Sequence, residues 1–411
     1  MPSYTARSKR QSRAESRNQP ATVGLLRSIN RAAVLDTIRR YSPISRSEIA
    51  QRLGLSLPTV MRIVDGLQAE DLVRNGGKGE STGGRPSPLL EFNGNAYAVV
   101  GADLGGSRMY GTVADLSGNI QYEVYLPRSS DHVQQLFRLL DDLLAAPRPD
   151  GQQVRGIAVG VPGITRAREG VVTYAPSLSW RELPLASLLS EHYDLPVFIE
   201  NDVNLAALGE MSFGAGQGAR DLIAVTVGIG IGAGVIIGGA IYRGHNQAAG
   251  EIGYLLPSLQ ALGKRYDEFG AFEAQASCLG LAERARRAAA ERGLVQANAS
   301  FASDLTAEDV YAAARQGEAW ARQAVAETAD LLALAIANMA ALLNPEVVIL
   351  GGSVSGAGDL LIEPIIARLQ GVVPFPPRVV ASQLGYRATA MGAIMLVLGA
   401  TSEFFVVSRV P

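Results

Sequence analysis

The stretch VGIGIGAG, Val227–Gly234, has the composition of a loop that approaches phosphate. It holds four glycines and directly follows an apolar run. Glycines allow backbone N–H groups to come close to an anion, as they do in nucleotide-binding loops. Glycine-rich β-hairpins are also common, so the stretch by itself leaves open whether it binds a nucleotide or only shapes a scaffold.

The elements that must position this loop occur twice along the chain. Residues 96–116, AYAVVGADLGGSRMYGTVADL, have the pattern of a strand, a glycine-rich turn and a second strand. Residues 221–239, DLIAVTVGIGIGAGVIIGG, repeat that pattern. Further buried strands are expected at VRGIAVGVPG, LPVFIEN and PEVVILGGSV. The repetition predicts an internally duplicated α/β architecture with a cleft between two lobes.

Charge separates the N-terminal part of the chain from the rest. Residues 1–90 hold 15 Lys and Arg against 7 Asp and Glu, whereas the remaining residues hold 22 against 32. A basic module attached to an acidic body indicates that one end meets nucleic acid. On charge alone, a merely solvated basic face is the alternative.

Composition places the chain among globular proteins of a reducing compartment. Apolar residues make up 47% of it, and its single cysteine, Cys278, excludes an intramolecular disulfide and a multi-cysteine zinc site. The polar, basic first 20 residues have no apolar core, so they do not read as a secretory signal. The apolar run Leu331–Leu343 carries Asn338 and reads as a buried helix. We expect a cytoplasmic protein with no membrane segment.

Residues 21–90 have the pattern of a helix-turn-helix domain that follows a disordered basic arm, residues 1–20. Ser45 and Glu48 form a capping box, Gly54 supplies a turn, and Ser56 caps the next helix. In such a domain the second helix lies in the major groove. Candidate DNA contacts follow from this placement: Arg46 to phosphate, Ser56 and Thr59 to phosphate or base, and Arg62 to a guanine edge. A three-helix protein-interaction module is the alternative.

A glycine- and proline-containing segment, GGKGESTGGRPSPLLEFN, follows these helices. It predicts a hairpin or loop of the kind that forms a wing. Arg85, beside two glycines, is the residue we expect to enter a narrow minor groove, where negative potential is concentrated. A plain linker is the alternative.

Several motifs, taken in order, resemble the ROK family of sugar kinases and sugar-responsive repressors. They are DLGGS at 103–107, VGVPG, APSLSW, ENDVN, AAGEIGY, FGAFEA and ILGGSV, preceded by a helix-turn-helix and GGRP. The resemblance covers nearly all of residues 25–400. It implies an N-terminal winged helix-turn-helix domain followed by a duplicated, two-lobed, actin-like (ribonuclease H-like) ATPase fold.

The resemblance also implies roles for individual residues. Asn201 and Asp202 would contact sugar hydroxyls, and in the kinases the aspartate is the general base. Glu251 and Glu273 would accept hydrogen bonds from other hydroxyls. The phosphate loops would be formed by Asp103, Gly105, Gly106, Ser107, Gly228 and Gly230. Without the resemblance, an N-cap at Asn201 and a solvated turn at Glu251 are the simpler interpretations.

The chain departs from the family pattern at the metal motif and at the second phosphate loop. Tyr254 stands where a histidine is usual, and Ala271 and Phe272 stand where a cysteine is expected, so we predict no zinc. We expect apolar packing, in place of a zinc ion, to hold the segment 255–272. Ile229 replaces a threonine, which removes a hydroxyl donor for phosphate. We therefore expect no catalytic residue, no use of ATP or Mg²⁺, and phosphate loops that are vestigial.

The sequence predicts a DNA-binding transcriptional regulator, favoured as a repressor of carbohydrate genes, that responds to a sugar in the interlobe cleft. Its partners would be double-stranded operator DNA, a sugar effector and a second copy in a homodimer or homotetramer. The alternative is an ATP-dependent sugar kinase, with Asp202 as base, that carries a DNA-binding module. The lobes are expected at residues 91–200 and 201–411, with the C-terminal helix returning to the first lobe or the DNA-binding domain.

Overall fold

The computed structural model describes residues 19–78, 88–105, 108–127, 129–149, 151–264, 270–293 and 305–401. The chain forms two compact units. The first contains residues 1–96 with 398–411, and the second contains residues 97–397.

The first unit is a winged helix-turn-helix domain. Its elements are α1 (Gln19–Tyr41), β1 (Ile44–Ser45), α2 (Arg46–Leu53), α3 (Leu57–Ala69), β2 (Val73–Lys78), β3 (Pro88–Phe92) and η1 (Gly94–Ala96). The capping box of Ser45 and Glu48 begins α2, and Gly54 ends it in the left-handed conformation, as the sequence indicates. Strands β2 and β3 pair antiparallel and form the two arms of a wing, with β1 on the outer side of β3. Apolar side chains of the three helices form the core, with Val34, Leu35, Ile38, Ile49, Val60, Val64 and Leu67 all fully buried.

The second unit contains two five-stranded sheets with the same topology. The first has the order β11-β7-β4-β5-β6 and the second has the order β16-β15-β12-β13-β14. In each, a three-strand antiparallel meander is extended by two parallel strands beside its first strand. The duplication predicted from the two strand–glycine–strand patterns is therefore present.

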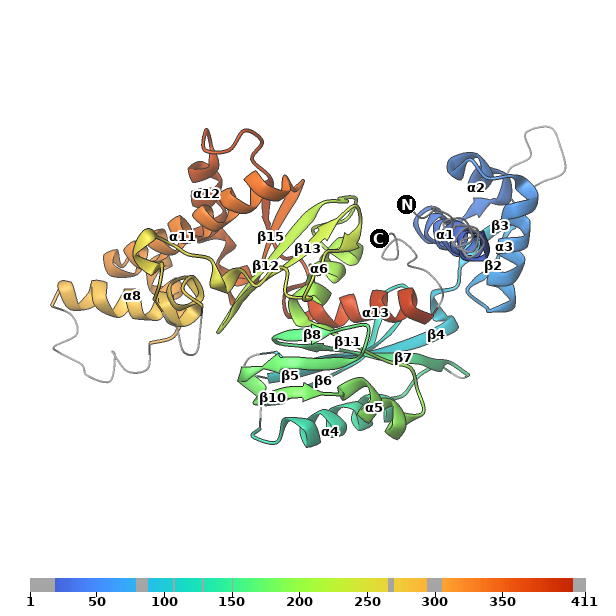
Figure 1. The fold of residues 1–411 in the computed structure, drawn as a ribbon, viewed down its shortest axis with the longest axis horizontal. Helices are drawn as coiled ribbons and strands as arrows, with labels where there is room; N and C mark the ends of the chain where they lie inside the picture. Colours follow the sequence, from blue (N-terminus) through green and yellow to red (C-terminus); the bar gives the residue numbers. More distant parts are fainter. Residues whose placement is uncertain are drawn as a thin grey trace, which may run out of the picture. The chain divides into compact units, whose positions relative to one another are not determined.

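The first lobe is built on β4 (Tyr97–Asp103), β5 (Arg108–Asp115), β6 (Ile120–Pro127), β7 (Gln153–Val161) and β11 (Val197–Asn201). It also holds a small antiparallel sheet of β8 (Ile164–Arg166), β9 (Val171–Ala175) and β10 (Trp180–Leu183), next to η2 (Pro176–Leu178). Helices α4 (His132–Ala145) and α5 (Leu185–Tyr193) lie against one face of the main sheet (Figure 1). Their residues Leu136, Leu139, Leu140, Leu185 and Leu189 share one core with that sheet.

The second lobe is built on β12 (Leu222–Val227), β13 (Ile231–Ile237), β14 (Ala240–Ile241), β15 (Val347–Gly352) and β16 (Arg378–Ala381). Its helices are α7 (Glu273–Ala276), α8 (Cys278–Glu291), α10 (Ala307–Gln316), α11 (Ala319–Leu343) and α12 (Gly358–Leu369). Short 3-10 turns complete it: η3 (Ile252–Tyr254), η4 (Leu259–Ala261), η6 (Ser353–Ala357) and η7 (Gly385–Arg387). By length and apolarity α11 resembles a membrane span, but half of its most apolar window is buried in the lobe, as in the core helix of a globular protein.

Helices α6 (Asp202–Phe213) and α13 (Ala388–Thr401) cross at very close range. A Cβ at Gly209 would overlap the Ala388 carbonyl, and a Cβ at Gly392 would overlap the Leu205 carbonyl. Helix α13 also packs against the first-lobe sheet, where Gly101 faces Ala390 and Ala393. The C-terminal helix thus returns to the first lobe, and the first unit continues to Ala96, beyond the boundary expected at residue 90.

Replacing Gly209 tests this crossing. Alanine favours a helix over glycine by roughly 1 kcal/mol, but here its methyl group would meet backbone atoms of α13 that cannot rotate away. We expect Gly209→Ala to lower the free energy of unfolding by about 1–3 kcal/mol in thermal or denaturant unfolding. Gly356→Ala is the matched control, because no atom lies within 4 Å of its added Cβ. Equal stability of the two variants would show that the crossing is not tight.

Candidate functional site

The N-terminus of α6 brings two of the predicted sugar-site residues to the end of strand β11. Asn201 is the N-cap: its Oδ1 accepts the Asn204 N–H at 3.0 Å, and its Nδ2 donates to the Gly163 carbonyl at 3.0 Å. Asp202 is the first helical residue, and its carboxylate accepts the Val203 N–H at 2.9 Å. The N-cap interpretation of Asn201 is therefore correct, and it also fixes the direction of Asp202.

Glu251 and Glu273 come from the second lobe. Glu251 directly precedes η3, and Glu273 begins α7, where its Oε2 accepts the Ile231 N–H at 2.6 Å. Burial, together with the smaller effects of the Asp202 and Glu273 carboxylates, raises the pKa of Glu251 to about 7. Burial also raises the pKa of Asp202 to about 6. Glu251 thus feels both of the other carboxylates, and we call Asn201, Asp202, Glu251 and Glu273 together the carboxylate site.

A cavity of about 440 Å³ adjoins Asp202 and joins the two glycine loops. Asp103, Gly105, Gly228 and Ile229 line it, whereas Gly106 and Ser107 lie outside the described residues. Burial raises the pKa of Asp103 well above its usual range, and the Asp202 carboxylate adds to that shift. Its Oδ1 is buried and accepts no hydrogen bond from the part of the chain that the structure describes. Asp103 thus offers a buried acceptor at the cavity.

Only two glycines of VGIGIGAG belong to the loop itself. Gly228 and Gly230 form the turn between β12 and β13, closed by the Gly228 N–H to the Gly230 carbonyl at 2.9 Å. Gly232 and Gly234 lie in β13, where an added Cβ would meet Val203 and other atoms of α6. These two glycines therefore permit close packing of a helix on a strand and do not form a phosphate cradle.

The recognition helix α3 presents a mixed outward face. Leu57 and Met61 are 43% and 47% exposed, and Arg62 is also exposed. The exposure of Arg62 is consistent with the contact predicted for it. A basic side chain between exposed apolar ones suits a major groove that offers guanine acceptors and thymine methyl groups.

The other predicted DNA contacts already have partners within the domain. Arg46 donates to Gln68 at 3.1 Å and lies 3.9 Å from Asp65, so its side chain turns toward α3. The hydroxyls of Ser56 and Thr59 lie 2.8 Å apart, and Ser56 also accepts the Thr59 N–H. Arg85 lies outside the described residues. Their contacts with DNA stay predictions.

Comparison with known families decides the identity of the body. A model described as the ROK family matches residues 99–400, most of the chain, and a model described as the MarR family matches residues 24–79. This chain belongs to the ROK family.

The ROK relatives include both regulators and kinases. The chain is 33% identical over 393 residues to a xylose repressor of Caldicellulosiruptor bescii, covering 92% of this chain and 98% of that protein. A ROK family transcriptional regulator described as a homolog of the E. coli MLC protein shares the fold, with a TM-score of 0.79, 23% identity and coverage of 93% of this chain and 98% of that chain. A ROK family glucokinase from Streptomyces griseus, solved with glucose and AMPPNP, is 30% identical, covers 73% of this chain and 98% of that chain, and has a TM-score of 0.63.

The structure adds polar residues to this ROK cleft that the sequence motifs did not identify. Hydroxyl groups line the cavity from strands, turns and helix α13, namely those of Thr226, Ser353, Ser355, Ser382 and Thr389. Arg108 and Tyr386 line it as well, with the guanidinium 5.4 Å from the ring centre. For Thr226 the sequence did carry a signal, because it is the single polar residue in the otherwise apolar strand β12, LIAVTV. The loop lacks the threonine hydroxyl that Ile229 replaces, but the hydroxyl groups named above still line the cavity.

The segment after Glu251 is held in part by the apolar packing that we expected. We expected apolar packing to hold it, and Phe272 is indeed buried with Ile252 in the core. Leu256, Leu259 and Leu262, however, point into solvent, with Leu259 87% exposed. These leucines lie in a stretch of short turns after η3, without a helix or strand of their own to pack them.

Among the described residues no group of three or more His, Cys, Asp or Glu side chains is arranged to hold a metal ion. The prediction that the protein holds no zinc stays untested.

The raised pKa of Glu251 makes stability depend on pH. A buried carboxyl whose pKa is about 7 contributes its full stability while protonated, and that contribution is lost as the pH rises from about 4.5 through 7. We expect Glu251→Gln to gain about 2 kcal/mol of unfolding free energy over wild type between pH 5 and pH 8, seen as a rise in relative Tm. The exposed Glu363→Gln is the control. A pH-independent difference would contradict the burial of Glu251.

The exposed position of Arg62 predicts a role in reading sequence. Arg62→Ala should reduce discrimination between an operator and a mismatched duplex by roughly 1–3 kcal/mol, because a bidentate contact to guanine is lost. Competition binding on the two duplexes measures it. Arg40→Ala, at the end of α1, serves as the control. Equal losses on every sequence would reassign Arg62 to phosphate.

Proposed function

We propose that this protein is a sugar-responsive transcriptional repressor. Its winged helix-turn-helix domain binds operator DNA, and a sugar in the carboxylate site changes the affinity for that DNA. The observation that carries the proposal is the presence, in one chain, of an exposed recognition-helix face and a cluster of hydrogen-bond acceptors in the ROK body.

The chemistry of the carboxylate site suits a polyol. Asp202, Glu251 and Glu273 are acceptors, and a sugar ring supplies a hydroxyl donor for each. Burial makes an unpaired acceptor unfavourable, so a ligand rich in hydroxyl groups gains more here than in water. D-Xylose is the first sugar to test, because the relatives aligned along almost the whole chain include a xylose repressor.

The response requires that sugar bind one conformation better than another. Closure of the lobes on the sugar would then depopulate the form that binds DNA, and a coupling of about 1–3 kcal/mol gives a useful switch. Because such coupling is reciprocal, operator DNA weakens sugar binding to the same extent. We propose that the regulator acts as a homodimer or homotetramer, so that two recognition helices meet two half-sites, and that it works in the cytoplasm.

A sugar kinase with an added DNA-binding domain is the second candidate. The observation that favours it is Asp202, a buried carboxylate with a pKa of about 6, which is suited to accept a proton from a sugar hydroxyl. Against it, Ile229 is 47% exposed at the cavity, where a phosphate would meet an apolar side chain. We propose that the protein uses neither ATP with Mg²⁺ nor zinc. An assay with ATP and a sugar panel separates the two candidates, and turnover that depends on Asp202 would select the kinase.

A sugar panel scored by release of bound operator tests the proposed function. We expect D-xylose or another aldose to release the operator from the full-length protein. If no sugar in the panel changes operator affinity while another class of effector does, the sugar response is wrong.

Asp202→Asn tests the site itself. The substitution removes the charge and one acceptor but keeps the size of the side chain, so sugar binding should weaken about tenfold or more. Operator binding without sugar should stay intact, because Asp202 lies in the body. Asp142→Asn, exposed on α4, is the control. Loss of operator binding together with sugar response would indicate that Asp202 mainly supports folding.

A further inference from the structure

Glu200, one residue before the N-cap of α6, is a buried carboxylate directly behind the carboxylate site. Its side chain is 1% exposed. One oxygen accepts the Asn201 N–H and the Asn204 Nδ2 group, both at 3.0 Å. The other accepts Nε and Nη2 of Arg243 at 2.8 and 2.6 Å. Two donor groups of asparagines and two of Arg243 therefore bind the same carboxylate, which holds them close together.

Glu200 and Arg243 belong to different lobes, because Glu200 lies in β11 of the first. Asn201 and Asn204 form the first turn of α6, at the end of a first-lobe strand. Arg243 follows β14 of the second lobe and starts the segment 243–250, which leads to Glu251. The Ala249 N–H donates to the Arg243 carbonyl at 3.0 Å, and Ala233 N–H donates to the Gly250 carbonyl at 2.8 Å. This segment is therefore closed on itself and anchored on β13 just before Glu251.

A second contact ties the same segment to the first lobe. The Gln247 side-chain oxygen accepts the Ala167 N–H, in the turn between β8 and β9, at 2.9 Å. Gln247 holds the left-handed backbone conformation, with φ of 56°. An unbranched, non-glycine residue in this region is uncommon, which indicates that the surrounding contacts fix the local geometry.

We propose that Arg243 is a positioning residue of the sugar site, acting through Glu200. The pair holds the Asn201–Asn204 turn of one lobe in register with the segment that ends at Glu251 in the other. The hydrogen-bond acceptors of the site would then already be positioned before a sugar binds. Separation of the lobes would strain the contact between Glu200 and Arg243. This inference rests on the proposed function, because it assigns a role in the same site.

Replacing Arg243 alone would be difficult to interpret, so a second variant is needed beside it. Arg243→Met leaves Glu200 buried without its charge partner, which is strongly destabilising, whereas removing both members of a buried pair is often neutral. The double variant Glu200→Gln with Arg243→Met therefore tests position without an isolated charge. Arg243→Lys keeps the charge but cannot reproduce the two guanidinium contacts, so it tests geometry.

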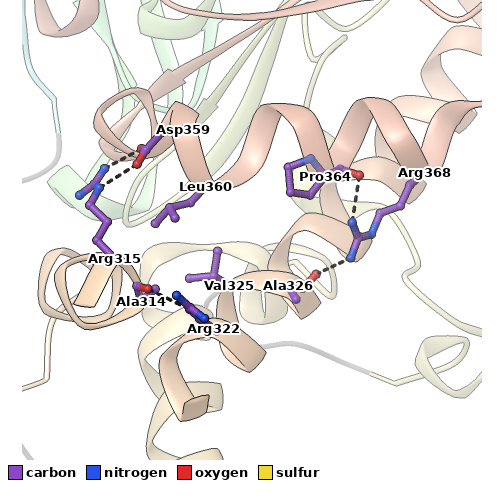
Figure 2. A pocket seen from close by; sticks show the side chains of 9 residues that line it. All are labelled: Ala314, Arg315, Arg322, Val325, Ala326, Asp359, Leu360, Pro364 and Arg368. Atoms are coloured by element: carbon purple, nitrogen blue, oxygen red, sulfur yellow. Dashed lines mark hydrogen bonds and ion pairs between the residues drawn. The ribbon is translucent and has the colours of Figure 1, made fainter. Parts of the chain in front are cut away.

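A control pair of the same chemistry, but more exposed, lies elsewhere in the second lobe. Figure 2 shows Arg315 of α10 paired with Asp359 of α12 in a hollow of about 470 Å³, with donor–acceptor distances of 2.9 and 2.7 Å. None of the residues that line this hollow belongs to the carboxylate site. Arg315→Met thus removes an arginine–carboxylate pair between elements of one lobe without touching the proposed sugar ligands.

The experiment measures D-xylose affinity by calorimetry and backbone hydrogen exchange by mass spectrometry in the full-length protein. We expect Arg243→Lys and the double variant to bind xylose about tenfold more weakly or worse. Exchange should rise in peptides that cover 201–205 and 243–252, with Tm within a few degrees of wild type for the double variant. Arg315→Met should match wild type in both readouts.

Two results would overturn the positioning role. One is wild-type xylose affinity and wild-type exchange in the double variant, which would make the pair purely structural. The other is an equal loss of affinity in Arg315→Met, which would make the effect general. If wild-type protein binds no sugar of the panel, the proposed function fails instead, and the exchange of the two segments still decides whether Arg243 positions them.

Discussion

Burial of carboxylates beside one cleft is the constraint on which the rest of this body depends. A carboxylate taken out of water needs donors, a charge partner or a proton. The donor differs from one carboxylate to the next. Asp202 accepts an N–H at a helix N-terminus, Glu273 accepts the Ile231 N–H, and Glu200 accepts a guanidinium. For Glu251 the described residues supply no donor of this kind, and its pKa rises to about 7. The acceptor capacity that remains is what a polyhydroxy ligand would satisfy.

Close backbone packing makes that arrangement possible. The first turn of α6 carries Asn201 and Asp202, and the helix is held between β13, where glycines replace side chains, and α13, where Gly209 and Gly392 meet. A side chain at any of these glycines would move the helix and with it the acceptors. Several glycines of the body are therefore required by packing, and the glycine content of a loop is a poor measure of phosphate binding.

The cleft of a sugar-kinase fold and the face of a winged helix-turn-helix are joined in this chain. Its ROK relatives carry the same body as regulators and as kinases. The cavity beside Asp202 keeps hydroxyl groups from Thr226 and Thr389 while Ile229 enters its rim. The two-lobed form of the body is therefore kept, with an apolar side chain among the residues that line this cavity.

The sequence by itself determined the order of elements, the duplicated sheets and the caps of the helix-turn-helix. These follow from periodicity and capping, which act between residues close in the chain. Tertiary structure alone decided that Glu200 meets Arg243, that Thr389 of the last helix reaches the Asp202 carbonyl, and that Leu259 faces solvent. The physical reason is that such contacts join residues far apart in sequence, and their side-chain directions depend on how the sheets and helices pack.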